Sequence, residues 1–300
     1  MTDQLLTNQL VTARPTDTGR TAAAIVLAVV LWGSAFIAIR VVGHSLSPAP
    51  MALLRLGVAA AALTALVLVK GAARVRLSRT SLLLVGAYAV LWLAGYTVAL
   101  NAGERFIDAG TAALLVNLAP LMVAFGAGRF LREGFSRPLI TGSLVALGGA
   151  AIIATGATAQ RNVAGVLLCV LAAVLYAAGV LIQKVALRNV DGLTAIWLGC
   201  VIATVVLLPW APQLVGELRV APAGAILATV YMGIFPTAIG FTAWAYALRR
   251  TDAGRLTATT YAVPAVSVLL SWLVLAEIPT VYSLVGGAVC LTGVAISRRR

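Results

Sequence analysis

The feature that most constrains the fold is an internal duplication in which matching residues stand 144 positions apart. The pairs that keep this offset include an aspartate, a proline and a glutamate in each half, and one aromatic residue near the start of each half: Asp108 with Asp252, Pro120 with Pro264, Glu133 with Glu277, and Trp32 with Tyr176. Spacing that is shared over such a length indicates two copies of one structural unit.

Long apolar runs fill most of both copies. Hydrophobic residues make up 61% of the sequence and charged residues 10%, with a mean hydropathy of +1.02, which leaves too little polar material to cover a soluble globule. A helix needs about 17 to 25 apolar residues to cross a bilayer. Ten segments meet this requirement, at 22–42, 49–69, 80–100, 109–131, 136–155, 163–185, 192–210, 222–246, 254–275 and 280–296. The sequence therefore predicts an all-α integral membrane protein with ten transmembrane helices.

The positions of Lys and Arg predict how these spans are oriented, because cytoplasmic loops retain basic residues. With both termini inside, 17 basic residues fall on the inner side and 4 on the outer side, and Arg55 lies within a span. Each half has an odd number of spans, so the second half enters the membrane from the opposite side. We expect two inverted five-helix repeats. The predicted boundaries are a disordered cytoplasmic tail at 1–20, repeats at 21–157 and 158–297, and a basic cytoplasmic end at 298–300.

Several of these residues resemble those of a known family. Leu31-Trp32-Gly33-Ser34 with Phe36 stands in the first span, Arg55 in the second, and each half carries its proline and closing glutamate. With the ten spans and the duplication, the chain from about residue 22 to residue 296 resembles the EamA-type members of the drug/metabolite transporter superfamily. The resemblance implies an inner-membrane carrier with a central cavity that works by alternating access, commonly as an exporter of amino acids or other small metabolites.

The two matched prolines predict a candidate substrate site. Pro120 and Pro264 lack the N–H of an ordinary helical residue, so each is expected to kink its span and free a carbonyl at membrane depth. Asn117 and Tyr261, matched across the duplication, stand beside them. They could line a shared central site, or each could hydrogen-bond to a neighbouring helix. We favour the shared site.

Aromatic residues supply a second candidate surface. Tyr88, Trp92 and Tyr96 recur every four residues and are predicted to share one face of the third span. For Trp32, Trp92 and Tyr176, lining of a cavity and ordinary packing both stay open, while Tyr96 is expected in the interfacial aromatic belt. An aromatic wall with few polar anchors suits a small-molecule substrate such as a hydrophobic or aromatic amino acid.

Arg55 is the basic residue that lies well inside a span. It could bind a substrate carboxylate. The alternative, which its reach to the membrane interface favours, is a structural role in which the side chain snorkels outward or bonds to backbone carbonyls. The matching position in the second half is Gly199, so the arginine is not imposed by the duplication.

The matched acidic residues are expected at helix ends. Asp108 and Asp252 are predicted N-caps, and Glu133 and Glu277 are predicted to pair with loop cations or terminal donors at the opposite ends, so that all four are structural or gate-rim residues. Glycines of the fifth and tenth spans are predicted to let these two helices pack closely: Gly142, Gly148, Gly149, Gly286, Gly287 and Gly293.

Other functions are disfavoured by residues that the spans do not contain. All nine acidic residues lie in tails or at span ends, which argues against a proton relay through a membrane-buried carboxylate. The sequence has no HExxH, GxSxG or paired membrane aspartates for an intramembrane enzyme, and no cofactor or metal is expected. It also has no basic face interleaved with aromatics, so nucleic acid is not an expected partner. The remaining alternatives are a multidrug efflux carrier, an intramembrane enzyme and a structural membrane subunit; the oligomeric state is not indicated.

Overall fold

The computed structural model describes residues 15–43, 45–70, 77–106, 112, 115–134, 136–155, 162–275, 280–297 and 299, and these residues form helices and short connections without strands. The helices are α2 (Pro15–Val42), α3 (Pro48–Val69), α4 (Arg79–Tyr88), η2 (Ala89–Tyr96), α5 (Thr97–Gly103), α7 (Ala119–Phe130), α8 (Arg137–Thr155), α9 (Val163–Ala186), α10 (Gly192–Leu207), η3 (Leu208–Trp210), α11 (Ala211–Leu218), α12 (Ala223–Met232), η4 (Gly233–Ile239), α13 (Gly240–Arg250), α14 (Ala253–Ala258), η5 (Thr259–Tyr261), α15 (Ala262–Leu275) and α16 (Val281–Ser297).

Six stretches of the described chain are helical, long and apolar enough to cross a membrane: Thr18–Ile39, Pro48–Val69, Arg79–Gly103, Val163–Ala186, Gly192–Leu218 and Ala223–Arg250. Shorter apolar helices occupy Arg137–Ile152 and Leu284–Ser297. Of the predicted tail at 1–20, residues 15–20 belong to α2, and residues 1–14 lie outside the described residues. Pro15 can open this helix since its missing N–H has no partner at a helix start in any case.

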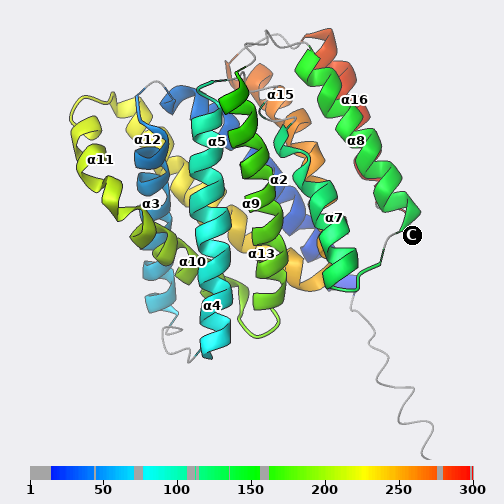
Figure 1. Cartoon of the computed structure of the whole chain (residues 1–300), viewed down its shortest axis with the longest axis horizontal. Helices are drawn as coiled ribbons and strands as arrows, with labels where there is room; N and C mark the ends of the chain where they lie inside the picture. Colours follow the sequence, from blue (N-terminus) through cyan, green and yellow to red (C-terminus); the bar gives the residue numbers. More distant parts are fainter. Residues whose placement is uncertain are drawn as a thin grey trace, which may run out of the picture.

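The first helix of each half packs into the other half. α9 contacts α4, η2, α5 and α7, and α2 contacts α12, η4, α13 and α15. Figure 1 shows α9 between α5 and α7 of the first half. The two halves are therefore joined by an exchange of their first helices, so each half is completed by a helix of the other.

A π-helix stands at the same place in both halves. η2 begins at Ala89 and η4 at Gly233, 144 residues later, and each lies within a longer helix that continues as an α-helix on either side. A π-helix has more residues per turn than an α-helix and is frequent at functional sites. Its presence in both halves shows that the duplication extends to this local deformation.

The predicted packing of the fifth and tenth spans is confirmed for α8 and α16, which lie side by side at one edge of the bundle (Figure 1). A Cβ atom added to Gly149 would lie 2.5 Å from the backbone nitrogen of Cys290 and 2.6 Å from the carbonyl oxygen of Gly286. Gly142 and Gly293 approach the facing backbone equally closely, whereas Gly148 has open space around it. Close backbone approach at small residues is the usual way for membrane helices to associate.

Each matched proline lies where the form of its helix changes. Pro120 lies in the first turn of α7, which starts at Ala119 after a turn at residues 117–118. Pro264 lies in the first turn of α15, after the 3₁₀ turn η5. In a first turn, the missing N–H of proline leaves no hydrogen bond unmade. An α-helix thus starts anew just before each matched proline, after a turn in the first half and after a 3₁₀ turn in the second.

Candidate functional site

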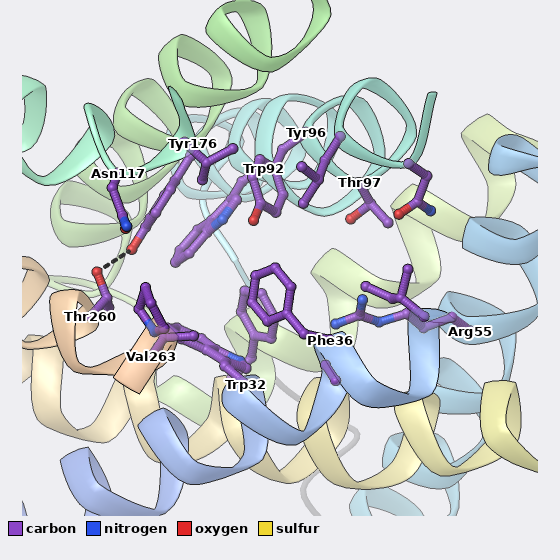
Figure 2. A pocket seen from close by; sticks show the side chains of 17 residues that line it. Trp32, Phe36, Arg55, Trp92, Tyr96, Thr97, Asn117, Tyr176, Thr260 and Val263 are labelled. Carbon is purple, nitrogen blue, oxygen red and sulfur yellow. Dashed lines mark hydrogen bonds between the residues drawn. The ribbon is translucent and has the colours of Figure 1, made fainter. Parts of the chain in front are cut away.

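A cavity lies between the two halves, in the middle of the bundle (Figure 2). It contains about 800 Å³ of space free of atoms, its open mouth included. The elements that supply its wall are α2, α3, η2, α5, α9, α13, η5, α15 and the segment before α7. The lining residues are Trp32, Ala35, Phe36, Ile39, Arg55, Trp92, Tyr96, Thr97, Leu100, Asn101, Val116, Asn117, Tyr176, Phe241, Thr260, Val263 and Pro264. Five of the predicted substrate residues, Trp32, Arg55, Trp92, Asn117 and Tyr176, are therefore brought together.

Aromatic rings form the middle of the wall. Trp92 stacks on Tyr176 with ring centroids 5.1 Å apart and an interplanar angle of 13°. Phe241 lies against both tryptophans, with its centroid 5.1 Å from Trp32 and 5.0 Å from Trp92. The indole nitrogen of Trp32 donates to the carbonyl oxygen of Pro236 at 3.1 Å. This bond holds the ring in place, and offset or edge-on ring pairs add about 0.5–1.5 kcal/mol each beyond their buried area.

Arg55 supplies the charge in this wall. Its Nε donates to Thr237 Oγ1 at 2.7 Å, and the hydroxyl of Thr237 donates in turn to the carbonyl oxygen of Met232 at 2.8 Å. Figure 2 shows the guanidinium directed into the cavity beside Phe36 and Thr97. The predicted snorkelling or carbonyl bonding is not observed. Of the three guanidinium nitrogens of Arg55, only Nε has a hydrogen-bond partner among the described residues. The two terminal nitrogens face the cavity.

The opposite end of the cavity is polar but uncharged. Tyr176 donates to Thr260 Oγ1 at 3.5 Å, a weak bond, and Asn117 lies beside this pair (Figure 2). Asn117 is 8% exposed, and its Nδ2 has no hydrogen-bond partner within the described part of the chain. An amide donor that is buried without a partner at a cavity wall is available to a bound molecule.

Tyr261 does not line the cavity, which corrects the prediction that it shares a site with Asn117. It is fully buried against Ala124, Leu139 and Ala146. The reason is the 3₁₀ turn at residues 259–261, which is wound more tightly than an α-helix and brings Thr260 to the cavity wall instead. Helical periodicity alone does not predict this one-residue change.

The expected aromatic face of the third span is also altered. Trp92 and Tyr96 line the cavity, whereas Tyr88 donates to the carbonyl oxygen of Ala195 on α10. The π-helix begins directly after Tyr88, and its longer turn changes which residues share a face. Tyr96, which was expected in the interfacial aromatic belt, is accordingly a cavity residue. The same register brings Thr97 and Asn101, which the sequence analysis missed, to the wall.

The bundle is closed near the ends of α7, α9 and α13. Lys184 Nζ donates to the carbonyl oxygens of Leu248 at 2.6 Å and Thr251 at 2.5 Å. Glu133 Oε2 accepts from the backbone N–H of Gly254 at 3.3 Å, and its Oε1 lies 4.0 Å from Lys184 Nζ. Glu133 therefore pairs with a terminal donor and a cation, the two kinds of partner that its position predicts.

The predicted cap by Asp252 is not formed. Asp252 stands at the N-cap position of α14, but its side chain makes no capping hydrogen bond and lies 3.6 Å from Arg255 instead. Glu133 instead accepts a hydrogen bond from the backbone N–H of Gly254, in the first turn of α14. Asp108, which matches Asp252, and Glu277, which matches Glu133, lie outside the described residues. Within the described residues, no group of His, Cys, Asp and Glu side chains could hold a metal ion.

Comparisons with known proteins agree with this architecture. A protein of known crystal structure superposes with a TM-score of 0.77 over 95% of this chain and 98% of its own, at 21% identity, which shows that the fold is shared. A probable terminal-alkyne amino-acid exporter of Streptantibioticus cattleyicolor is 38% identical over 282 residues, covering 92% of this chain and 93% of that protein. The uncharacterized transporter YdfC of Bacillus subtilis is 33% identical over 276 residues, covering 89% and 87%.

The sequence model of the EamA-like transporter family matches this chain twice, at residues 20–155 and 163–299, once in each half of the duplication. The matches cover nearly the whole length of these two relatives, which are named as a probable exporter and an uncharacterized transporter. This multi-pass membrane protein therefore belongs to the EamA-like transporter family.

Proposed function

We propose that this protein is a secondary transporter of the cell's inner membrane that exports a hydrophobic or aromatic amino acid, or a similar small carboxylate. The observation that carries the proposal is a largely aromatic cavity between the two halves with Arg55 directed into it. A guanidinium binds a carboxylate through two parallel N–H groups. The amino-acid exporter of Streptantibioticus cattleyicolor, 38% identical, supports this substrate class.

Each part of the substrate has a complementary part of the cavity. The free guanidinium nitrogens of Arg55 would hold the carboxylate, and the rings of Trp32, Trp92 and Phe241 would pack against the apolar side chain. An ammonium group over the same rings would gain about 0.5–2 kcal/mol from cation–π attraction. Asn117, at the far end, would donate to a polar group of the substrate.

The transport cycle would use ten spans arranged as two inverted repeats, with both termini in the cytoplasm. The cavity reaches the end of the bundle where α2 ends and α3 begins, since Ile39, Arg55 and Asn101 belong to its wall. The contacts of Lys184 close the other end. In the proposed orientation, the cavity faces outward in this structure, as it would after release of an exported substrate, and rocking of the halves would open the inner end.

Two other functions fit the cavity less well. A multidrug efflux carrier for cationic compounds would need an anionic counter-group, and the described cavity wall has an arginine and no carboxylate. A structural membrane subunit would not need a cavity into which an arginine points and where, within the described residues, the Nδ2 of Asn117 has no partner.

Counterflow in liposomes tests the proposal. Vesicles loaded with unlabelled phenylalanine, leucine or a terminal-alkyne amino acid should accumulate the labelled compound, whereas vesicles loaded with a lipophilic cation should not. Arg55→Gln should lower uptake at least tenfold and Arg55→Lys less, because lysine keeps the charge but loses the bidentate geometry. Arg219→Gln is the control, since Arg219 is exposed and outside the cavity. Transport of cations, or full activity of Arg55→Gln, would refute the proposal.

A further inference from the structure

In the described part of the second half, three buried side chains carry polar atoms that this conformation leaves without a well-formed hydrogen bond. They are Gln183, Trp244 and Tyr261, which are 0%, 1% and 0% exposed. Within the described part of the chain, the indole nitrogen of Trp244 and the hydroxyl of Tyr261 have no hydrogen-bond partner. The Gln183 amide lies near the hydroxyl of Tyr88 but makes no hydrogen bond of good geometry. A buried polar group without a partner is destabilising, because it has lost its hydrogen bonds to water. Such groups are uncommon enough that each calls for a physical reason.

The duplication supplies a common reason for all three. The residues 144 positions before them are Ile39, Leu100 and Asn117. All three of these matching residues line the central cavity. The unpartnered polar groups of the second half therefore occupy the positions that, in the first half, form the open wall.

Glycines at other matched positions show that the second half is filled where the first is open. Gly199 matches Arg55, and a Cβ atom added to Gly199 would overlap the hydroxyl of Tyr88. Gly179 matches Ala35, and a Cβ atom there would overlap Trp92. Positions that line open space in the first half are thus closely packed in the second half. This difference is expected when a pair of inverted repeats adopts two conformations in turn.

The closed end lies directly beyond two of the three polar groups. Gln183 immediately precedes Lys184 on α9, and Trp244 stands four residues, about one turn, before Leu248 on α13. The hydrogen bonds from Lys184 to Leu248 and Thr251 join these same two helices. Separation of α9 from α13 at this contact would uncover both Gln183 and Trp244.

We infer that Gln183, Trp244 and Tyr261 line a second cavity, open at the end that Lys184 closes in this structure, and that they bind the substrate there. The inference rests on the proposed transport function. The three groups offer N–H and O–H donors, so the ligand that they fit is the carboxylate or another acceptor of the substrate. Gln183, whose amide makes no hydrogen bond of good geometry here, is the specificity-determining residue of this second cavity.

Cysteine labelling tests the second cavity without any substrate. Gln183→Cys should react slowly with a small polar maleimide in the otherwise unchanged protein. It should react at least fivefold faster when Lys184→Met removes the closing hydrogen bonds, while Ile39→Cys should react more slowly. The unsubstituted protein gives the background, because Cys169, Cys200 and Cys290 are buried.

Thr229→Cys is the matched control for general loosening. Thr229 is 0% exposed like Gln183, and neither it nor its matching residue Val85 lines the cavity. It should stay unlabelled with and without Lys184→Met. Equal acceleration at Thr229 and Gln183, or no acceleration at Gln183, would overturn the inference. A protein that transports amino acids while Gln183→Cys stays protected refutes this inference alone, and failed counterflow with accelerated labelling refutes only the proposed substrate.

A second variant separates substrate binding from packing. Gln183→Leu removes the amide while nearly keeping its volume, and removal of a buried polar group without a well-formed hydrogen bond relieves the cost of its lost hydration. The thermal midpoint of the purified protein should rise, while amino-acid counterflow should fall at least fivefold. Gln183→Asn, which retains an amide, should keep more of the activity. A stabilised Gln183→Leu protein with unchanged transport would show that Gln183 has no role in the second cavity.

Discussion

Glu133 Oε2 accepts a hydrogen bond from the backbone N–H of Gly254, and this 3.3 Å contact ties the end of α7 to the start of α14. α7 belongs to the first half of the duplication and α14 to the second. The other carboxylate oxygen lies 4.0 Å from Lys184 Nζ. One glutamate therefore provides the helix cap that Asp252 does not provide, and it joins the two halves at the closed end of the cavity.

Replacement of Glu133 should weaken this end of the bundle. Glu133→Ala removes the capping acceptor of α14 and should lower the free energy of unfolding by about 1 kcal/mol, the usual cost of losing an N-cap. Glu133→Gln keeps an oxygen for Gly254 and should lose less. Asp252→Ala is the control, because that side chain caps nothing and is half exposed, at 53%. Thermal unfolding in detergent measures all three, and equal losses for Glu133→Ala and Asp252→Ala would contradict the assignment.

Arg132, the residue before Glu133, has a strained backbone conformation. Arg132 has a φ of 59°, in the left-handed region, and the N–H of Glu133 donates to the carbonyl oxygen of Ala127 at 3.3 Å. This is the helix ending in which glycine is usual, because a side chain raises the energy of the left-handed conformation by about 1–2 kcal/mol. Arg132→Gly should therefore raise the free energy of unfolding by about 1 kcal/mol. Arg132→Ala also removes the charge but keeps a Cβ atom, so a similar rise with alanine would exclude backbone strain as the cause.

The sequence predicted the features that depend on composition and spacing. Apolar runs gave the positions of the long helices, and the 144-residue offset pointed to matched elements that the structure shares down to the two π-helices. Gly149 and Gly293 marked the contact of α8 with α16, because glycine permits close backbone approach wherever two membrane helices meet. Asn117, favoured for a central site, lies on the cavity wall, and so do Trp32 and Trp92, for which the sequence left cavity lining and ordinary packing open.

The features that the sequence did not predict depend on tertiary contacts or on local changes in helical pitch. The exchange of α2 and α9 between the halves leaves no periodic signal, since an apolar helix buries equally well against either half. Tyr88, Tyr96 and Tyr261 were misplaced because a π-helix and a 3₁₀ turn change the residue spacing on a face.

The orientation of Arg55 should depend on Thr237. Thr237 is 1% exposed and accepts from Arg55 Nε at 2.7 Å, and a hydrogen bond to a charged group contributes about 1.5–3 kcal/mol. Thr237→Val keeps the shape but removes the acceptor, so the guanidinium should lose its fixed position. The KM for a transported amino acid should rise about tenfold, with little change in protein yield.

Thr242→Val is the control for this prediction. Thr242 donates to the carbonyl oxygen of Ala238 at 2.6 Å, a helix back-bond like that of Thr237 to Met232, but it does not contact the arginine. Its KM should match that of the unsubstituted protein. Concentration-dependent uptake into liposomes gives both values, and an equal rise in the two variants would show that the back-bond, and not Arg55, is responsible.

The contact between α8 and α16 should distinguish two adjacent glycines. A Cβ atom at Gly149 would lie 2.5 Å from the backbone nitrogen of Cys290, which cannot move without parting the helices, whereas a Cβ atom at Gly148 would meet nothing within 4 Å. Gly149→Ala should therefore destabilise by about 1–3 kcal/mol through overpacking. Gly148→Ala should be neutral or stabilising by up to about 1 kcal/mol, since alanine is the better helix former. Thermal midpoints of the two purified variants decide the matter, and an equal fall in both would mean that α8 and α16 are not in close backbone contact at Gly149.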